Sequence, residues 1–163
     1  INSDEYRGVI IMQFMLVGTA SIYYGDEVQI DGRTSDNEGC RAPFPWDRDF
    51  RENDTWKFYQ QLAHRKAEDR LLAEGGQKFL YAAGGVLALA RFTRERALVA
   101  VMSVSGRDEV IRLPLGVLGA SGFSGERDVF GSPIELLAGE CDRHSVRMLV
   151  RAHKAYLCET VFG

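Results

Sequence analysis

The amino-terminal segment carries the pattern of a buried helix. Ser3 or Asp4 can cap its amino end, because a short polar side chain accepts hydrogen bonds from the first free N–H groups. Its apolar positions are Val9, Ile10, Met12, Phe14, Met15 and Leu16. These positions surround most of the helix rather than one face, so the pattern predicts a helix that is covered on nearly all sides and ends at Gly18.

A short strand, a long loop and a second helix follow in the pattern. Residues 20–24 are small or aromatic and show no alternation, which is typical of a buried parallel strand covered on both faces. Residues 25–54 are rich in glycine, proline and polar side chains, and a loop of this length inside a compact domain is usually functional. Asn53 or Asp54 then caps a helix that runs to about Glu68. Helix, strand and helix together indicate an α/β unit.

After Gly75 and Gly76 apolar residues recur at every second position, which indicates antiparallel strands joined by short turns. The expected strands are 78–81, 86–92, 97–103, 110–113, 126–130, 145–149 and 155–159. This rhythm is typical of an antiparallel β-sandwich. We therefore expect two domains, residues 1–76 and residues 77–163, and an α/β plus all-β fold class.

Composition narrows the function classes. The formal net charge of −3 provides no basic surface for nucleic acid or for acidic membrane lipid. No apolar run is long enough for a transmembrane helix, and the polar start Ile1–Glu5 is unlike a signal peptide. The three cysteines form no CxxC pair, which favours buried free thiols and a cytoplasmic rather than secreted protein. The three histidines are scattered, so we expect no metal and no cofactor.

A resemblance to a known family rests on residues 18–66. The stretch GTASIYYGDE at residues 18–27 resembles the last barrel strand of the α-amylase family, whose members often read GxPxIYYGDE there. The residues that follow are similar to the neopullulanase, cyclomaltodextrinase and maltogenic amylase branch. They are Asp36, Cys40-Arg41, Pro45-Trp46-Asp47, Trp56 and His64-Arg65-Lys66. The resemblance implies the last helix-strand-helix part of a (β/α)8 barrel followed by a carboxy-terminal β domain.

The sequence departs from the family pattern at three places. Ala20 stands where proline is usual, and Phe44-Pro45 stands where a methionine-containing stretch is common. Asp36 lies five residues before Arg41, whereas the family pattern places the aspartate four before, where this chain has Asn37. The acidic partner of Arg41 therefore stays open between these two positions.

The resemblance implies an α-glucan hydrolase that acts with retention, but no catalytic residue in this chain. Retaining hydrolysis needs two carboxyl groups about 5–5.5 Å apart, and in the family they lie on earlier barrel strands. Asp26 and Glu27 are adjacent, so on a strand they would point to opposite faces. They either line the strand-end site or, as we favour, hold the loop together with Tyr24. We expect the chain alone to be inactive and to be part of a longer enzyme.

Substrate contacts are expected from the long loop. Arg41 can donate paired hydrogen bonds to sugar hydroxyls or organise the loop by a salt bridge, with Asp36 or Asn37 completing the contact. Trp46 can offer a flat face to a sugar ring, although a tryptophan between proline and aspartate more often anchors its loop in the core. The expected partner is an α-glucan such as starch, maltodextrin or cyclodextrin, bound by the whole enzyme.

Two other functions compete with this interpretation. Residues 77–163 can be a carbohydrate-binding module, which needs exposed aromatic side chains on one sheet face. The strand pattern instead places most of the aromatic residues of this part on the inward, core-facing positions of the strands. They are Phe79, Tyr81, Phe92, Phe123, Phe130 and Tyr156. The chain can also be a non-catalytic interaction protein on an amylase-like fold. If the chain stands alone, it is expected to self-associate, because one helix-strand unit cannot close a barrel and residues 20–24 would form an unpaired apolar edge.

Overall fold

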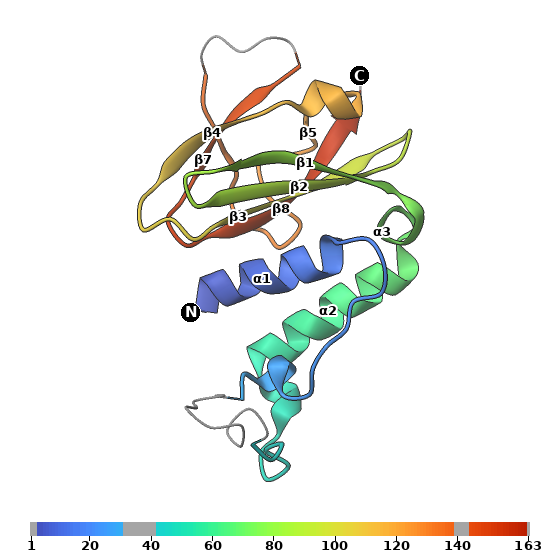
Figure 1. The fold of residues 1–163 in the computed structure, drawn as a ribbon, viewed down its shortest axis with the longest axis vertical. Coiled ribbons are helices and arrows are strands. Elements are labelled where there is room, and N and C mark those ends of the chain that lie inside the picture. Colours follow the sequence, from blue (N-terminus) through green and yellow to red (C-terminus); the bar gives the residue numbers. More distant parts are fainter. Residues whose placement is uncertain (1–2, 31–41, 139–143, 163) are drawn as a thin grey trace.

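The computed structural model describes residues 3–30, 42–138 and 144–162 and arranges them in three layers (Figure 1). A three-stranded sheet packs on one face of a five-stranded sheet, and helices pack on the other face. The helical elements are α1 (Ser3–Met15), η1 (Asp26–Val28), η3 (Phe50–Glu52), α2 (Asp54–Glu68), α3 (Arg70–Glu74) and η4 (Leu115–Leu118). The strands are β1 (Gly76–Ala83), β2 (Val86–Phe92), β3 (Ala97–Ser103), β4 (Glu109–Leu113), β5 (Ala120–Phe123), β6 (Glu135–Leu136), β7 (Val146–Val150) and β8 (Ala155–Phe162).

Both sheets are antiparallel, as the period-two pattern predicts. The larger sheet has the strand order β1-β2-β3-β8-β5, and the smaller has the order β4-β7-β6. The observed strands overlap the predicted ones at 78–81, 86–92, 97–103, 110–113, 145–149 and 155–159. Alternation along β3 divides its side chains between two cores. Val99 and Val101 face the smaller sheet, whereas Leu98 and Ala100 face the helices.

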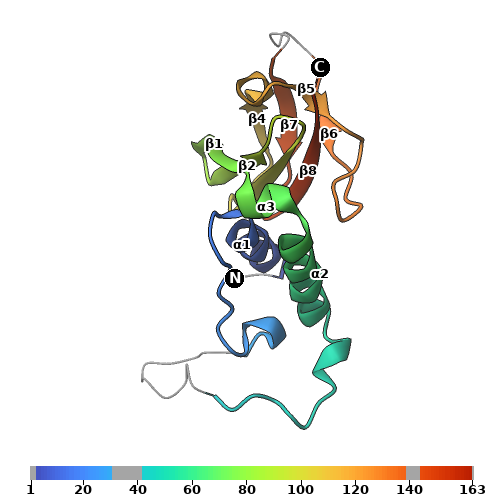
Figure 2. The same ribbon diagram turned by 90° about the vertical axis from the view of Figure 1, so that its right-hand side faces the viewer.

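The helical layer is built around α1, which lies between the large sheet and α2 (Figures 1 and 2). Its buried residues include Ile10, Phe14 and Met15, but Val9 and Leu16 are exposed, so the helix is covered on fewer sides than its apolar pattern predicts. The predicted start of α2 is confirmed, since Asn53 Oδ1 accepts hydrogen bonds from the N–H groups of Thr55 and Trp56 at 2.8 and 3.3 Å.

Two predicted strands are wrong. Residues 20–24 form no strand, and within the described part of the chain no neighbouring strand lies beside them to supply backbone partners. Residues 126–130 form a turn, because the buried carboxylate of Asp128 binds the turn's own backbone. Its Oδ1 accepts from Phe130 N and Ser132 N at 3.0 and 2.7 Å, and its Oδ2 accepts from Leu157 N at 3.2 Å.

The core between helices and sheet draws on both sides of the predicted boundary at residue 76. It joins Ile10 and Phe14 of α1 and Leu62 of α2 to Leu98 and Leu157 of the β part. The two parts therefore share one apolar core, and the division into domains 1–76 and 77–163 stays a prediction.

Most of the aromatic residues of the β part serve this packing. Tyr156 is buried, and Tyr81, Phe92 and Phe123 pack against the core between the sheets. Phe79 differs, since 55% of its surface is exposed. Along the described residues no helix combines the length and the apolar character that crossing a membrane requires.

The shared core can be tested with Leu98, whose side chain is fully buried on the helical face of β3. We expect Leu98→Ala to lower the free energy of unfolding by about 2–5 kcal/mol, because it leaves a cavity under α1. Urea unfolding followed by circular dichroism measures this change. The matched control, Val110→Ala, removes an exposed side chain of β4 and is expected to change stability by about 0.5 kcal/mol or less. Equal losses for both variants would contradict the shared core.

Candidate functional site

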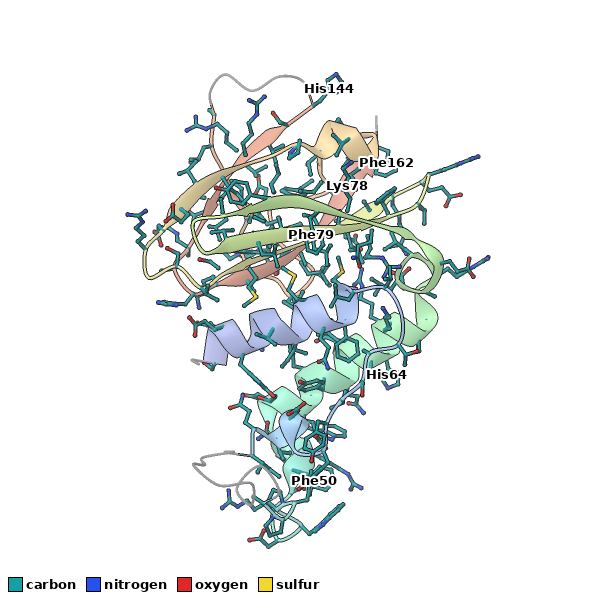
Figure 3. All side chains as sticks on the ribbon, in the orientation of Figure 1. Phe50, His64, Lys78, Phe79, His144 and Phe162 are labelled. Atoms are coloured by element: carbon teal, nitrogen blue, oxygen red, sulfur yellow. The ribbon has the colours of Figure 1, made fainter. Side chains whose placement is uncertain are left out.

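The candidate site lies at the end of the helical layer that points away from the sheets, around residues 23–30 and 42–56 (Figure 3). Tyr24, Asp26, Glu27 and Trp46 fall in this region. Arg41, Asp36 and Asn37, the other substrate-binding candidates, lie outside the described residues. Phe50, labelled in Figure 3, marks this end of the molecule.

Asp26 and Glu27 accept hydrogen bonds from the backbone of their own turn. Glu27 Oε2 accepts a hydrogen bond from Gly25 N at 2.8 Å, and Asp26 Oδ2 accepts one from Tyr23 N at 3.3 Å. Ile30 N donates to Gly25 O at 2.9 Å and closes the turn. Gly25 has a φ of 92°, and an added Cβ would lie 2.5 Å from Ile30 Cδ1, so only glycine fits. These contacts are those expected of a loop-holding role for Asp26 and Glu27.

The turn is fastened to both long helices. Tyr6 of α1 donates its hydroxyl hydrogen to Asp26 O at 2.9 Å, and Gln29 Nε2 donates to Thr55 Oγ1 of α2 at 2.7 Å. Burial raises the pKa of Tyr6 and, more strongly, that of its neighbour Tyr59, so both phenols stay protonated and available as donors. Tyr24 OH donates to Ala42 O at 3.3 Å. The turn therefore contacts the residue next to Arg41.

An aromatic cluster forms the rest of the site. The ring centroids of Phe44 and Trp46 are 4.5 Å apart, and Phe50 lies 5.4 and 6.0 Å from these two rings. Trp56 at the start of α2 lies 6.1 Å from Phe50 and connects the cluster to the helix. The sequence pattern missed Phe44 and Phe50 as partners of Trp46, although apolar aromatic residues two and four positions away in a polar loop were a usable signal.

The expectation that Trp46 anchors its loop in the core is wrong. Its side chain is 77% exposed and rests against Phe44 and Phe50 at the surface. Partly buried phenyl rings support the indole from one side and leave much of it open to solvent. An open aromatic ring can stack on an apolar sugar face, and such stacking needs no charge.

The two adjacent carboxylates of the family motif, Asp26 and Glu27, already have partners within their own turn. The described residues also contain no group of three or more His, Cys, Asp and Glu side chains that could hold a metal ion. The arrangement presents an exposed aromatic surface beside a turn that is held by hydrogen bonds.

No family model matches the chain, but the sequence and structure comparisons both find cyclomaltodextrinases and maltogenic α-amylases. A cyclomaltodextrinase of Thermoanaerobacter pseudethanolicus is 33% identical over 104 residues, which is 64% of this chain and 18% of that enzyme. Neopullulanase 2 of Thermoactinomyces vulgaris is 25% identical over 114 residues, 69% of this chain and 19% of that enzyme. The chain thus spans less than a fifth of the length of these two relatives.

Solved structures agree in fold. A cyclomaltodextrinase structure superposes with a TM-score of 0.73 at 23% identity, covering 98% of this chain and 26% of that one. A maltogenic α-amylase of Thermotoga neapolitana superposes with a TM-score of 0.76 at 13% identity, covering 100% of this chain and 38% of that one. These superpositions span the helices and both sheets.

The chain is therefore a partial match to the α-amylase family of glycoside hydrolases. Within that family it is similar to the branch that contains cyclomaltodextrinases, neopullulanases and maltogenic amylases, and the part it matches is a carboxy-terminal portion. The resemblance carried by residues 18–66 is thereby confirmed.

The surface position of Trp46 predicts a small effect on stability. We expect Trp46→Ala to change the free energy of unfolding by less than about 1 kcal/mol, because an exposed ring loses only its contacts with Phe44 and Phe50. Urea unfolding of the isolated chain measures this value. Phe58→Ala, which removes a buried aromatic ring of α2, is the control and should cost about 3–5 kcal/mol. A comparable cost for Trp46→Ala would restore the core-anchor interpretation.

Proposed function

We propose that this chain is the carboxy-terminal part of a retaining α-glucan hydrolase and that it supplies a substrate-side loop rather than catalytic groups. In this proposal residues 1–76 complete a (β/α)8 barrel and residues 77–163 brace it. The observation that carries the proposal is the exposed Trp46 cluster, which lies on the loop that follows the family motif, five residues after Arg41 in the sequence. The similarity to cyclomaltodextrinases supports it.

The proposed roles follow from the chemistry of the side chains. Arg41, with Asp36 or Asn37, would bind sugar hydroxyls through paired hydrogen bonds. Trp46 would stack on an apolar sugar face, and Tyr24, Asp26 and Glu27 would hold the loop that carries these groups. The nucleophile and the acid of the hydrolysis would come from the remainder of the parent enzyme.

The relatives bear on substrate and location. Their names include cyclomaltodextrinase and amylopullulanase, and a structural neighbour was solved with maltotriose at 13% identity and a TM-score of 0.70. We therefore propose an α-glucan as the ligand of the whole enzyme. An intracellular maltogenic amylase of Bacillus subtilis is 36% identical over 76 residues, which supports a bacterial cytoplasmic location.

A chimera tests the proposal. The matched carboxy-terminal segment of the Thermoanaerobacter pseudethanolicus cyclomaltodextrinase is replaced by this chain, and release of reducing sugar from β-cyclodextrin is measured. We expect the chimera to hydrolyse β-cyclodextrin. Its Trp46→Ala variant should lose about 10-fold or more in kcat/KM, because stacking of one ring on an aromatic side chain contributes about 1–3 kcal/mol at other binding sites. A folded chimera without activity would contradict the proposal.

The isolated chain provides the control that separates a support role from a stand-alone binding module. Calorimetric titration with maltoheptaose and with β-cyclodextrin is expected to give no heat of binding, because the sugar site needs the rest of the barrel. Saturable binding by the chain alone would favour the module. The burial of Tyr156 and the packing of Tyr81, Phe92 and Phe123 already leave that module few exposed aromatic groups.

We further propose that the isolated chain self-associates through the segment that follows α1. Its exposed apolar residues are Leu16, Val17, Ile22, Tyr23 and Tyr24. In the parent enzyme this surface would meet the barrel, whereas in isolation a second copy can cover it. Multi-angle light scattering should show a mass that rises with protein concentration, and a double variant, Val17→Ser with Ile22→Ser, should reduce that rise. A monomer at millimolar concentration would contradict self-association.

A further inference from the structure

Arg91 is a fully buried cation whose hydrogen bonds go to backbone carbonyls. It lies on β2 with 0% exposure, and its guanidinium donates to Gly75 O at 2.8 Å and Gly76 O at 3.2 Å. It also donates to Met15 O at 3.1 Å and Leu16 O at 3.3 Å, at the carboxyl end of α1. Burial lowers the pKa of this guanidinium. A charge buried at this cost is retained only where its donors are well satisfied.

Two further side chains bind the same helix end. Lys66 of α2 donates from Nζ to Phe14 O at 3.0 Å and to Leu16 O at 2.7 Å. Gln77 of β1 accepts a hydrogen bond from Val17 N through Oε1 at 2.9 Å. Burial and the neighbouring charge of Arg91 lower the pKa of Lys66. Cations from α2 and β2 thus meet at the carbonyls that end α1.

The end of α1 is a suitable place for these cations. The last carbonyls of a helix have no partner within the helix and carry the negative end of its dipole. α1 has no basic residue in its last turn, so it cannot supply its own compensation. Gly18, with a φ of 90°, then turns the chain out of the helix. Arg91, Lys66 and Gln77 therefore fix the point and direction in which the chain leaves α1.

The chain that leaves this point leads directly to the candidate site. In Figure 1 it descends from the end of α1 to η1. There the turn at residues 23–30 contacts Ala42 through the 3.3 Å hydrogen bond from Tyr24 OH. The covalent chain from the α1 end and this hydrogen bond together connect that end to the loop that holds Trp46.

We infer that Arg91 is a positioning residue, which acts through the carboxyl end of α1 to set the substrate-side loop. In this role the β part does more than cover the helices, because a side chain of β2 fixes the point from which the chain runs to the loop at the far end of the helical layer. The consequence for sugar binding rests on the proposed function. The effect on the position of residues 17–30 does not.

The first experiment uses the chain itself. Hydrogen exchange of the backbone amides in residues 17–30 is compared for the native chain, Arg91→Met and Arg91→Lys. We expect exchange about 10-fold faster in Arg91→Met, since a hydrogen bond to a charged group is worth about 1.5–3 kcal/mol. Arg91→Lys keeps the charge but cannot reach α1 and Gly75 together, so its exchange should be intermediate. Amides of β3 and β8 should keep their protection.

Two variants keep the test decisive. If Arg91→Met does not fold, Lys66→Met removes the second cation from a partly exposed position and should accelerate exchange in the same residues. Arg151→Met is the matched control, because Arg151 pairs with Asp108 and Glu135 at 2.7 and 2.6 Å, remote from the end of α1. It should leave exchange in residues 17–30 unchanged. If neither Arg91→Lys nor Lys66→Met changes the exchange of residues 17–30, the inference is overturned.

The second experiment separates positioning from general stability. In the β-cyclodextrin-hydrolysing chimera, Arg91→Lys is expected to raise KM about 5-fold or more while kcat falls less, because a misplaced loop weakens sugar binding. A purely stabilising role would lower the amount of active enzyme and leave KM unchanged, which would overturn the inference. If the chimera with Arg91 intact is folded but inactive, the proposed function fails, and the exchange result alone decides the role of Arg91.

Discussion

The structure depends on the neutralisation of one helix end. α1 lies between the large sheet and α2, so the carbonyl of Met15 at its end is buried between these layers. Unpaired carbonyls in that position would cost free energy, since buried polar groups need partners. Arg91 from the sheet and Lys66 from α2 provide those partners, and the same contacts join the three elements. The hydrogen bonds that pair the last carbonyls of α1 therefore also hold α1, α2 and the large sheet together.

The large sheet owes its composition to being covered twice. β2 and β3 are buried along almost their whole length, because the small sheet packs on one face and the helices on the other. An antiparallel sheet more often leaves one face to solvent and alternates accordingly. Here the alternation is between two apolar cores instead. Arg91 is the exception on β2, and it is tolerated because it points to carbonyls rather than into a hydrocarbon core.

Local patterns predicted the elements whose causes are local. The Asn53 cap and the apolar positions of residues 54–68 were enough for α2, and the glycine pair at 84–85 was enough for the turn between β1 and β2. The strand prediction for residues 20–24 failed because strand formation needs a neighbouring strand, and the described residues place none beside this segment. Residues 126–130 failed because Asp128 binds three backbone N–H groups, one of them on distant β8.

In the candidate site, too, the features with local causes could be predicted from the sequence, and those with distant causes could not. The motif around Tyr24, Asp26 and Glu27 was recognisable from sequence, and the hydrogen-bond partners of its carboxylates lie within three residues, so its loop-holding role could be predicted locally and stays a prediction. The exposure of Trp46 was not, because the residues flanking a tryptophan do not determine which surface it rests on. Arg91 was also missed, since nothing in the local pattern of β2 indicates that α1, more than seventy residues earlier, ends against it. A buried cation within an otherwise apolar strand is nevertheless a readable signal. Its charge requires a nearby negative potential, and a helix carboxyl end supplies one without any carboxylate.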